Sequence, residues 1–204
     1  MDLPDRDRAR LSAAIRAAEA RTTGEIVCVM ARSSSVGRTA LPVVIAAVLA
    51  LAVPWLLMAL TTLSLQLILS IQVVVFLAAS AIACLPGVQA ALMPRAIRRA
   101  LAHRAAMEQF VIRGIARTKQ RTGILIFVSL AERYARIIAD DGIAARVPQA
   151  HWQGAVDELI AHTRDGRVAD GFIAAVEICG EVLATHFPSR GGGEDELPDR
   201  LYLI

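Results

Sequence analysis

The sequence has no charged residue between Thr39 and Pro94, although 20% of the whole chain is charged. This run is far longer than the roughly 20 apolar residues that cross the ~30 Å hydrocarbon core of a bilayer once. It has room for two crossings, and we predict transmembrane helices at residues 41–60 and 65–85 with a short turn between them. The alternative interpretation is a buried hairpin of a soluble protein, which the length of the uncharged run disfavours.

The motifs of several common catalytic and metal sites are also missing. The three cysteines form no CxxC pair, and Cys28 and Cys179 lie in apolar runs that predict buried thiols. No two histidines flank a glutamate at the spacing of a helical zinc site. A P-loop, a GxGxxG motif and a nucleophile elbow do not occur. The sequence therefore offers no catalytic constellation of these kinds.

No acid or base lies within the two predicted spans, which argues against a proton or ion pathway through them. Small residues instead recur at a spacing of four, which allows two helices to approach closely. These residues are Ala46 and Ala50 in the first span and Ala79 and Ala83 in the second. We expect them to serve packing of the hairpin, association with another membrane protein, or self-association.

Arginine flanks both ends of the uncharged run, and the predicted turn between the spans has none. The residues concerned are Arg21, Arg32 and Arg38 before the run and Arg95, Arg98, Arg99 and Arg104 after it. Positive charge near both outer ends favours keeping both on the cytoplasmic side. We therefore predict a two-span protein of the inner (cytoplasmic) membrane with cytoplasmic N- and C-termini. The first residues lack the features of a secretory signal, so no cleavage is expected.

The four arginines after the run form a basic patch that is predicted to lie at the lipid surface. Anionic headgroups attract such residues by about 1 kcal/mol per charge. Aromatic residues make up only 4% of the chain and the net charge is only +3, so nucleic acid is not an expected partner. The lipid bilayer is the partner that this charge pattern favours.

Outside the hairpin, the sequence repeats a helix, a Thr-Gly pair and an apolar strand. Residues 5–21 and 95–120 have apolar residues at helical spacing, Ile97, Leu101 and Ile112 among them in the second helix. The apolar runs EIVCVMA (25–31) and ILIFVSL (124–130) follow. Continuous apolar runs are typical of strands that are buried on both faces. We predict an α/β fold in which helices cover both faces of the sheet.

A third strand and two helices complete the predicted fold. Residues 134–139 follow the second strand after a short polar connection, which predicts a hairpin and makes the small sheet mixed. A helix over residues 149–164 precedes one that begins at Asp170 as its N-cap. The predicted organisation is 1–38 for the first part of the domain, 39–94 for the hairpin, 95–188 for the second part, and 189–204 for a linker and an apolar tail expected to dock.

This order of elements resembles the TPM domain family. The resemblance is carried by TGEIV from Thr23, by TGILIFVS from Thr122, and by the segment from Glu132 to Asp140. It covers nearly the whole chain and is closest to a bacterial branch in which a transmembrane hairpin interrupts the domain. It implies an α/β sandwich with a small mixed sheet. Family members are associated with assembly or repair of photosynthetic membrane complexes, modulation of a receptor channel, acid phosphatase activity and calcium binding.

The family's acidic site follows the third strand in a turn of the form Gly-x-Gly-hydrophobic-Glu. Residues 140–143 read DDGI here, and Ala144 stands where the glutamate would be. Asp140 and Asp141, with Glu132 as a third candidate, are the residues that would replace it as Ca²⁺ or Mg²⁺ ligands or as acid–base groups. The alternative interpretation is a solvated turn in which aspartate serves as a turn former.

From the sequence we favour a non-catalytic, membrane-anchored TPM-like module. Its cytoplasmic domain would bind a protein partner in the membrane or at its cytoplasmic face, or assist assembly or maintenance of a membrane complex. The first alternative is a membrane-tethered, cation-dependent phosphatase that uses Asp140 and Asp141. The second is a structural hairpin subunit that forms homo-oligomers through the face of Ala46 and Ala50.

Overall fold

The computed structural model of the chain describes residues 3–33, 40–85, 88, 94–189 and 196–204. It divides into two compact units, one formed by Met1–Ser34 and Arg99–Ile204 and the other by Ser35–Arg98. The first unit is an α/β domain that is discontinuous in sequence, and the second is a helical hairpin. Arg38 and residues 190–195 of the predicted linker lie outside the described residues.

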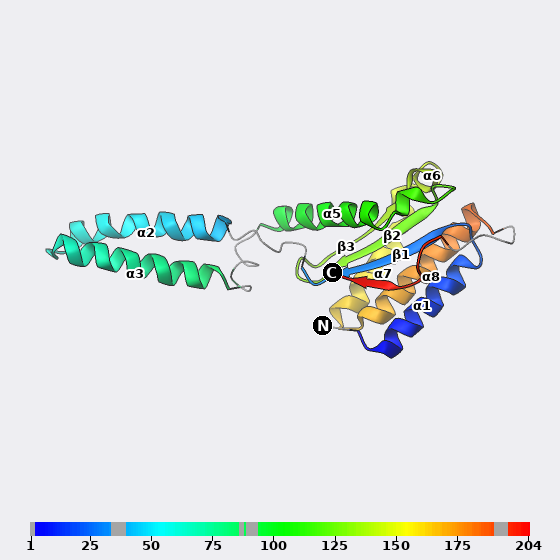
Figure 1. Ribbon diagram of the computed structural model, residues 1–204, viewed down its shortest axis with the longest axis horizontal. Helices are drawn as coiled ribbons and strands as arrows, with labels where there is room; N and C mark the ends of the chain where they lie inside the picture. Colours follow the sequence, from blue (N-terminus) through cyan, green and yellow to red (C-terminus); the bar gives the residue numbers. More distant parts are fainter. Residues whose placement is uncertain (1–2, 34–39, 86–87, 89–93, 190–195) are drawn as a thin grey trace. The chain divides into compact units, whose positions relative to one another are not determined.

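The α/β domain is built on a mixed sheet, as predicted, which has four strands because the C-terminal tail adds one to the three that the sequence predicts. The strands are β1 (Glu25–Ala31), β2 (Gly123–Ser129), β3 (Tyr134–Ala139) and β4 (Leu201–Leu203), in the order β3-β2-β1-β4 (Figure 1). β1 is parallel to β2 and β4, whereas β2 and β3 are antiparallel. Every residue of β1 and β2 is buried, which explains their continuous apolar sequences.

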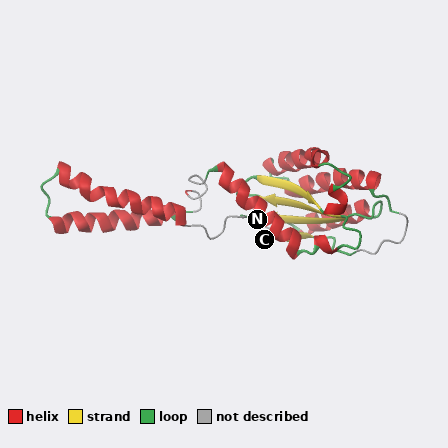
Figure 2. Ribbon diagram, turned by 90° about the horizontal axis from the view of Figure 1, so that it is seen from above, coloured by secondary structure: helices red, strands yellow, loops and turns green. Residues whose placement is uncertain are grey.

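Helices cover both faces of this sheet (Figure 2). One face packs against α1 (Asp5–Glu19), α7 (Gln153–Arg164) and α8 (Val168–His186), and the other against α5 (Arg95–Ile112) and the 3-10 helix η1 (Ile115–Arg117). Side chains of β1 alternate between these two cores, with Cys28 on the first face and Val29 on the second. Two short elements, α6 (Asp141–Ala144) and η2 (Gln149–Trp152), lie between β3 and α7 in the sequence.

Two helices differ in detail from the sequence prediction. α5 ends at Ile112 rather than at residue 120, because Gly114 adopts a left-handed conformation (φ 71°) and η1 follows. α8 begins at Val168, so that Asp170 is not its N-cap but lies in its first turn. Its carboxylate accepts a hydrogen bond from Arg10 instead, at 2.9 Å.

The C-terminal tail forms β4 at the edge of the sheet. The Ile204 N–H donates to the Met30 carbonyl oxygen and the Arg32 N–H donates to the Ile204 carbonyl oxygen, both at 3.0 Å. Tyr202 of β4 lies beneath the guanidinium of Arg113, which is 3.8 Å from the ring centroid. The apolar tail is therefore part of the folded domain.

The second unit consists of α2 (Ala40–Leu60) and α3 (Leu65–Ala83), two helices long and apolar enough to cross a membrane. Only 11% of the apolar window in α2 and 6% of that in α3 is buried. Ala46, Ala50 and Ala83 are buried within the hairpin and Ala79 is half-buried. Hydroxyl groups in and beside the helices bond to the preceding turn, as in the 2.9 Å bond from Ser70 to the Gln66 carbonyl oxygen.

Candidate functional site

The turn after β3 places Asp140 and Asp141 side by side at one end of the sheet. The Asp140 N–H donates to the Gly123 carbonyl oxygen at 2.9 Å, which extends the pairing of β3 with β2 by one residue. The Asp140 carboxylate is buried and caps α6 by accepting the Asp141 N–H at 2.7 Å. Backbone groups of Gly123 and Asp141 thus hold Asp140 in place. The side chain of Asp141, in contrast, is 89% exposed.

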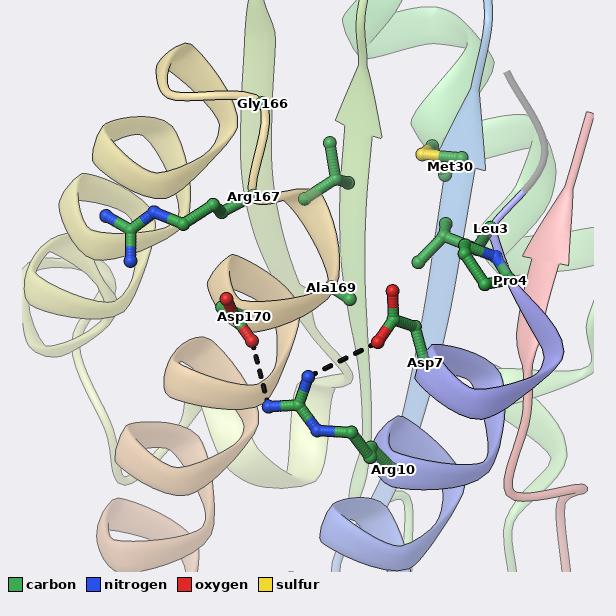
Figure 3. A pocket seen from close by; sticks show the side chains of 10 residues that line it. Leu3, Pro4, Asp7, Arg10, Met30, Gly166, Arg167, Ala169 and Asp170 are labelled. Carbon is green, nitrogen blue, oxygen red and sulfur yellow. Dashed lines mark hydrogen bonds and ion pairs between the residues drawn. The ribbon is translucent and has the colours of Figure 1, made fainter.

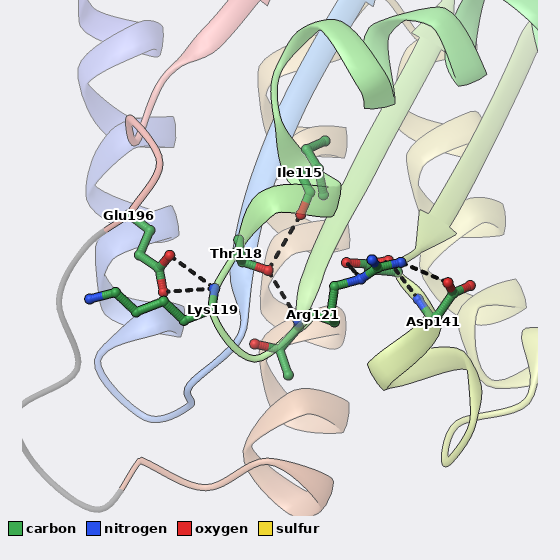
Figure 4. Close-up of polar contacts among 8 residues, drawn as sticks. Ile115, Thr118, Lys119, Arg121, Asp141 and Glu196 are labelled. Carbon is green, nitrogen blue, oxygen red and sulfur yellow. Dashed lines mark hydrogen bonds and ion pairs between the residues drawn. The ribbon is translucent and has the colours of Figure 1, made fainter.

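Arg121 joins the two carboxylates with a single guanidinium group (Figure 4). Its Nε lies 3.1 Å from Asp140 Oδ1 and 3.0 Å from Oδ2, and its Nη2 lies 2.7 Å from Asp141 Oδ2. Arg121 adopts a left-handed backbone conformation (φ 55°), which is uncommon for a residue with a side chain. The local chain path is fixed by the Thr118 hydroxyl, which accepts the Thr122 N–H at 3.2 Å.

Gly142 is required by the close approach of this turn to the backbone before β2. A Cβ atom at position 142 would lie 2.5 Å from the Arg121 carbonyl oxygen and 2.9 Å from that of Gln120. No larger residue fits without moving the backbone. The DDGI sequence therefore packs against Arg121, a partner that the sequence analysis did not identify.

The ion pairs of Arg121 with Asp140 and Asp141 occupy the carboxylates of the predicted cation site. A guanidinium already neutralises both carboxylates, and a bound Ca²⁺ or Mg²⁺ would have to displace it from Asp141. Among the described residues, no group of three or more His, Cys, Asp or Glu side chains is placed to hold a metal ion. Cation binding by Asp140 and Asp141 stays a prediction.

Glu132 lies at the opposite end of β3, in the turn between β2 and β3. Its buried carboxylate accepts hydrogen bonds from the hydroxyls of Ser129 and, at 3.0 Å, of Ser33. The six residues of β3 span roughly 20 Å. The structure therefore does not bring Glu132 together with Asp140 and Asp141.

A cavity of about 270 Å³ opens between the N-terminal ends of α1 and α8 (Figure 3). Its apolar lining includes Leu3 and Met30, and Arg10 crosses its rim. The Arg10 guanidinium donates to Asp170 at 2.9 Å and to Asp7 at 3.3 Å, so its charge is balanced by two carboxylates. This arrangement ties α1 to α8.

Three acidic residues gather where the C-terminal segment enters the sheet. The Glu19 carboxyl accepts the Ile26 N–H at 2.7 Å and is hydrogen-bonded to Asp199. Burial raises the pKa of Glu19 to about 10, and the neighbouring Asp199 carboxyl makes the second-largest contribution to this rise. The Glu25 carboxylate accepts the Leu197 N–H at 3.2 Å. The acids thus fasten the segment that leads into β4, with partners too distant in sequence for a local pattern to reveal.

The residues of the predicted basic patch all lie on α5. Arg95, Arg99 and Arg104 are exposed, and Arg98 is half-buried. Arg104 also pairs with Glu108 one turn later, at 3.2 Å. The patch is therefore available on the surface of one helix.

Comparison with known proteins supports the fold. Residues 94–182, less than half of the chain, match the TPM domain family. An NMR structure of the BA42 protein from the psychrophilic bacterium Bizionia argentinensis aligns with a TM-score of 0.64 and 19% sequence identity, covering 100% of this chain and 97% of that one. No curated protein matches the sequence. The chain is thus similar to TPM domains over residues 94–182 and shares the fold of the BA42 protein.

Proposed function

We propose that this protein is a membrane-anchored module whose TPM-like α/β domain binds a protein partner or assists assembly or maintenance of a membrane complex. The observation that carries the proposal is the exposure of the apolar hairpin, whose two windows are only 11% and 6% buried. A hairpin that served as the core of a soluble protein would be mostly buried. Exposed apolar surface of this extent favours a lipid environment.

The position of the hairpin in the chain supports two crossings. It leaves the domain after β1 and returns to it within α5, because β1 and the residues of α5 from Arg99 onward belong to the same folded unit. The two ends of the hairpin must then emerge on one side of the bilayer, as they do after an even number of spans. The flanking arginines favour the cytoplasmic side.

The turn of Asp140 and Asp141 would serve as a recognition edge of this domain. Arg121 holds both carboxylates in fixed positions, and the exposed Asp141 side chain remains accessible beside it. A preorganised pair of opposite charges suits recognition of a polar protein surface, because little side-chain freedom is lost on binding.

Membrane insertion can be tested on the full chain. Membranes containing the protein are washed with alkaline carbonate, and a single cysteine at Ser64 in a Cys84→Ser background is probed with an impermeant maleimide. We expect retention in the membrane and labelling from the periplasmic side only, with a cysteine at Ser12 as the cytoplasmic control. Release by carbonate would contradict the anchor, and cytoplasmic labelling at position 64 would contradict the orientation.

A cation-dependent phosphatase is a second proposal, supported by the TPM match that includes the Asp140–Asp141 turn. Its test is hydrolysis of a phosphomonoester by the detergent-solubilised protein with and without Ca²⁺ or Mg²⁺. Turnover that depends on the cation and is lost in the Asp140→Asn/Asp141→Asn variant would establish the enzyme. Absence of turnover by folded protein would leave the binding module.

A further inference from the structure

Exposed apolar side chains of the α/β domain concentrate on one helix. Outside the unit Ser35–Arg98, the described residues include four large hydrophobic side chains that are exposed, and three of them belong to α5. They are Met107 (42%), Val111 (65%) and Ile112 (68%). Single exposed apolar residues are ordinary on a protein surface, but a concentration on one helix indicates an interaction surface.

α5 has two apolar faces, and folding uses only one of them. Ala102, Ala106 and Phe110 are buried on the side that packs against the sheet. Met107 and Val111 are one turn apart on the outward side, so they lie next to each other on the helix surface. The helix therefore already covers the sheet without them, and their apolar character has no role in the domain core.

The charges on α5 suit an anionic surface. The helix carries four arginines and one acid, Glu108, which is paired with Arg104 at 3.2 Å. Arginine around an exposed apolar stripe is the composition of helices that lie in the interface of a membrane. The long arginine side chain can keep its charge among headgroups while its stem contacts apolar groups.

The connection between the end of α3 and the start of α5 is short. Residues 84–94 separate the end of α3 from the start of α5 and span at most about 40 Å when fully extended. α5 itself is about 27 Å long. If α3 crosses a bilayer, the whole length of α5 is within reach of its surface.

We propose that the outward face of α5, formed by Met107, Val111 and Ile112, lies in the headgroup layer of an anionic bilayer, with Arg104 against lipid phosphates. This inference rests on the proposed membrane anchor. In this orientation, α5 separates the sheet from the lipid, and α1, α7 and α8 lie on the far side of the sheet (Figure 1). The domain is then held flat on the membrane.

The test uses the full chain reconstituted into phosphatidylcholine vesicles with or without phosphatidylglycerol. Cys84 is replaced by serine, while Cys28 and Cys179 are buried and burial raises the pKa of both thiols, so they react slowly. An environment-sensitive dye is attached to a cysteine at Val111 or, as control, at the exposed Glu177 of α8. Quenching by lipids that carry a nitroxide near the headgroup reports contact with the bilayer.

We expect quenching at position 111 to exceed that at position 177 by about twofold or more, and to fall when phosphatidylglycerol is omitted. The Arg104→Gln variant should reduce it further. Equal quenching at the two positions, in protein that carbonate does not release, would overturn the inference and leave the anchor standing. Release by carbonate would refute the anchor itself.

A second copy of the chain is the competing occupant of this face. It would give a blue shift in the emission of the dye at position 111. This shift would rise with the ratio of protein to lipid and would not change with phosphatidylglycerol. That outcome would overturn the lipid contact. A Met107→Ser/Ile112→Ser variant provides a further check, since it should lower quenching at position 111 while leaving the thermal midpoint of the domain unchanged.

Discussion

α3 and α8 are both 19 residues long and both rich in apolar residues, yet they differ in where these residues are placed. α8 has nine buried residues, and its charged residues Asp170, Glu177 and Glu181 lie outside that face. α3 has no charged residue, and only Ile68 and Ala83 are buried. A helix with apolar residues on one face is stabilised by packing that face against another element. A helix that is apolar on all sides is stable only in apolar surroundings.

The polar groups of the two units differ in their carboxylates, because hydroxyls in the domain, such as those of Thr163 and Thr185, also bond to carbonyl oxygens of their own helices. In the hairpin, the hydroxyls of Thr61 and Ser70 bond to carbonyl oxygens four residues earlier, in α2 and α3 respectively. In the domain, the carboxylates of Glu19 and Asp140 bond to residues of other elements. A membrane helix satisfies its polar groups internally, whereas the domain relies on its tertiary structure. Four predictions test this difference, from the largest expected effect to the smallest.

Phenylalanine provides a matched pair of substitutions. Phe172→Ala in α8 removes a fully buried side chain and should lower the free energy of unfolding of the domain by about 3–5 kcal/mol. Phe76→Ala in α3 removes a side chain outside the domain core and should leave the domain unchanged. Both effects can be measured by thermal unfolding in detergent, with protease sensitivity of the domain as the signal. Similar destabilisation by the two changes would break the comparison.

An introduced arginine should have a large effect in α3 and a small effect in α8, which is the opposite of the pattern expected for the phenylalanine substitutions. Val74→Arg places a charge on the exposed surface of α3, where it should cost about 2.5–3.5 kcal/mol of insertion free energy. Glu177→Arg changes an exposed residue of α8 and should alter neither insertion nor folding by much. The fraction of protein retained after carbonate extraction tests this prediction. Full retention of the Val74→Arg protein would argue that α3 does not span the bilayer.

Removal of the Arg121 side chain should lower the stability of the domain, because the buried Asp140 carboxylate pairs with it. Arg121→Ala leaves the buried Asp140 carboxylate without its cation, and we expect a loss of about 1–3 kcal/mol, limited because the Arg121 side chain is 49% exposed. Adding Asp140→Asn should recover part of this loss. Chemical denaturation measures the effect. If the single variant instead binds Ca²⁺ and is stabilised by it, the cation proposal for this turn gains support.

Glu19 should give the domain a distinctive pH dependence. Its pKa is about 10 in the folded state and ordinary in the unfolded state, so its contribution to stability is complete below about pH 4.5 and is lost as the pH rises toward 10. Glu19→Gln cannot ionise and keeps an oxygen for the Ile26 N–H. It should therefore raise stability by about 1–2 kcal/mol at pH 8.5 and change it little at pH 5. Equal effects at the two pH values would contradict the assignment.

Three of the four strands and the bounds of the hairpin could be predicted because their signals are local. The apolar runs at 25–31 and 124–130 coincide with β1 and β2 to within a residue, and α2 and α3 fall within two residues of the predicted spans. The buried face of α5 could not be predicted. Its sequence has apolar residues on two sides, and Ile97 and Ile112 prove to be exposed while Ala102 and Phe110 are buried.

Of the candidate site, the sequence identified the acidic residues but not their partners. Asp140 and Asp141 are adjacent in sequence, so their proximity needed no structure. Arg121 lies 19 residues before Asp140, and only the pairing of β2 with β3 places the two side by side. The same pairing puts Glu132 at the other end of β3, which separates it from the acids that it was grouped with.

The sequence by itself determined which segments are apolar, where they begin and end, and that one apolar region has no polar face. These properties follow from hydrophobic periodicity and from the length of uncharged segments, both of which are local. Only the tertiary structure decided which carboxylates are neutralised by arginine, which carboxyl is buried beside another, and which face of α5 remains open. Such properties depend on burial and on contacts between residues far apart in the chain, because the environment of a charged or apolar group is set by what surrounds it in space.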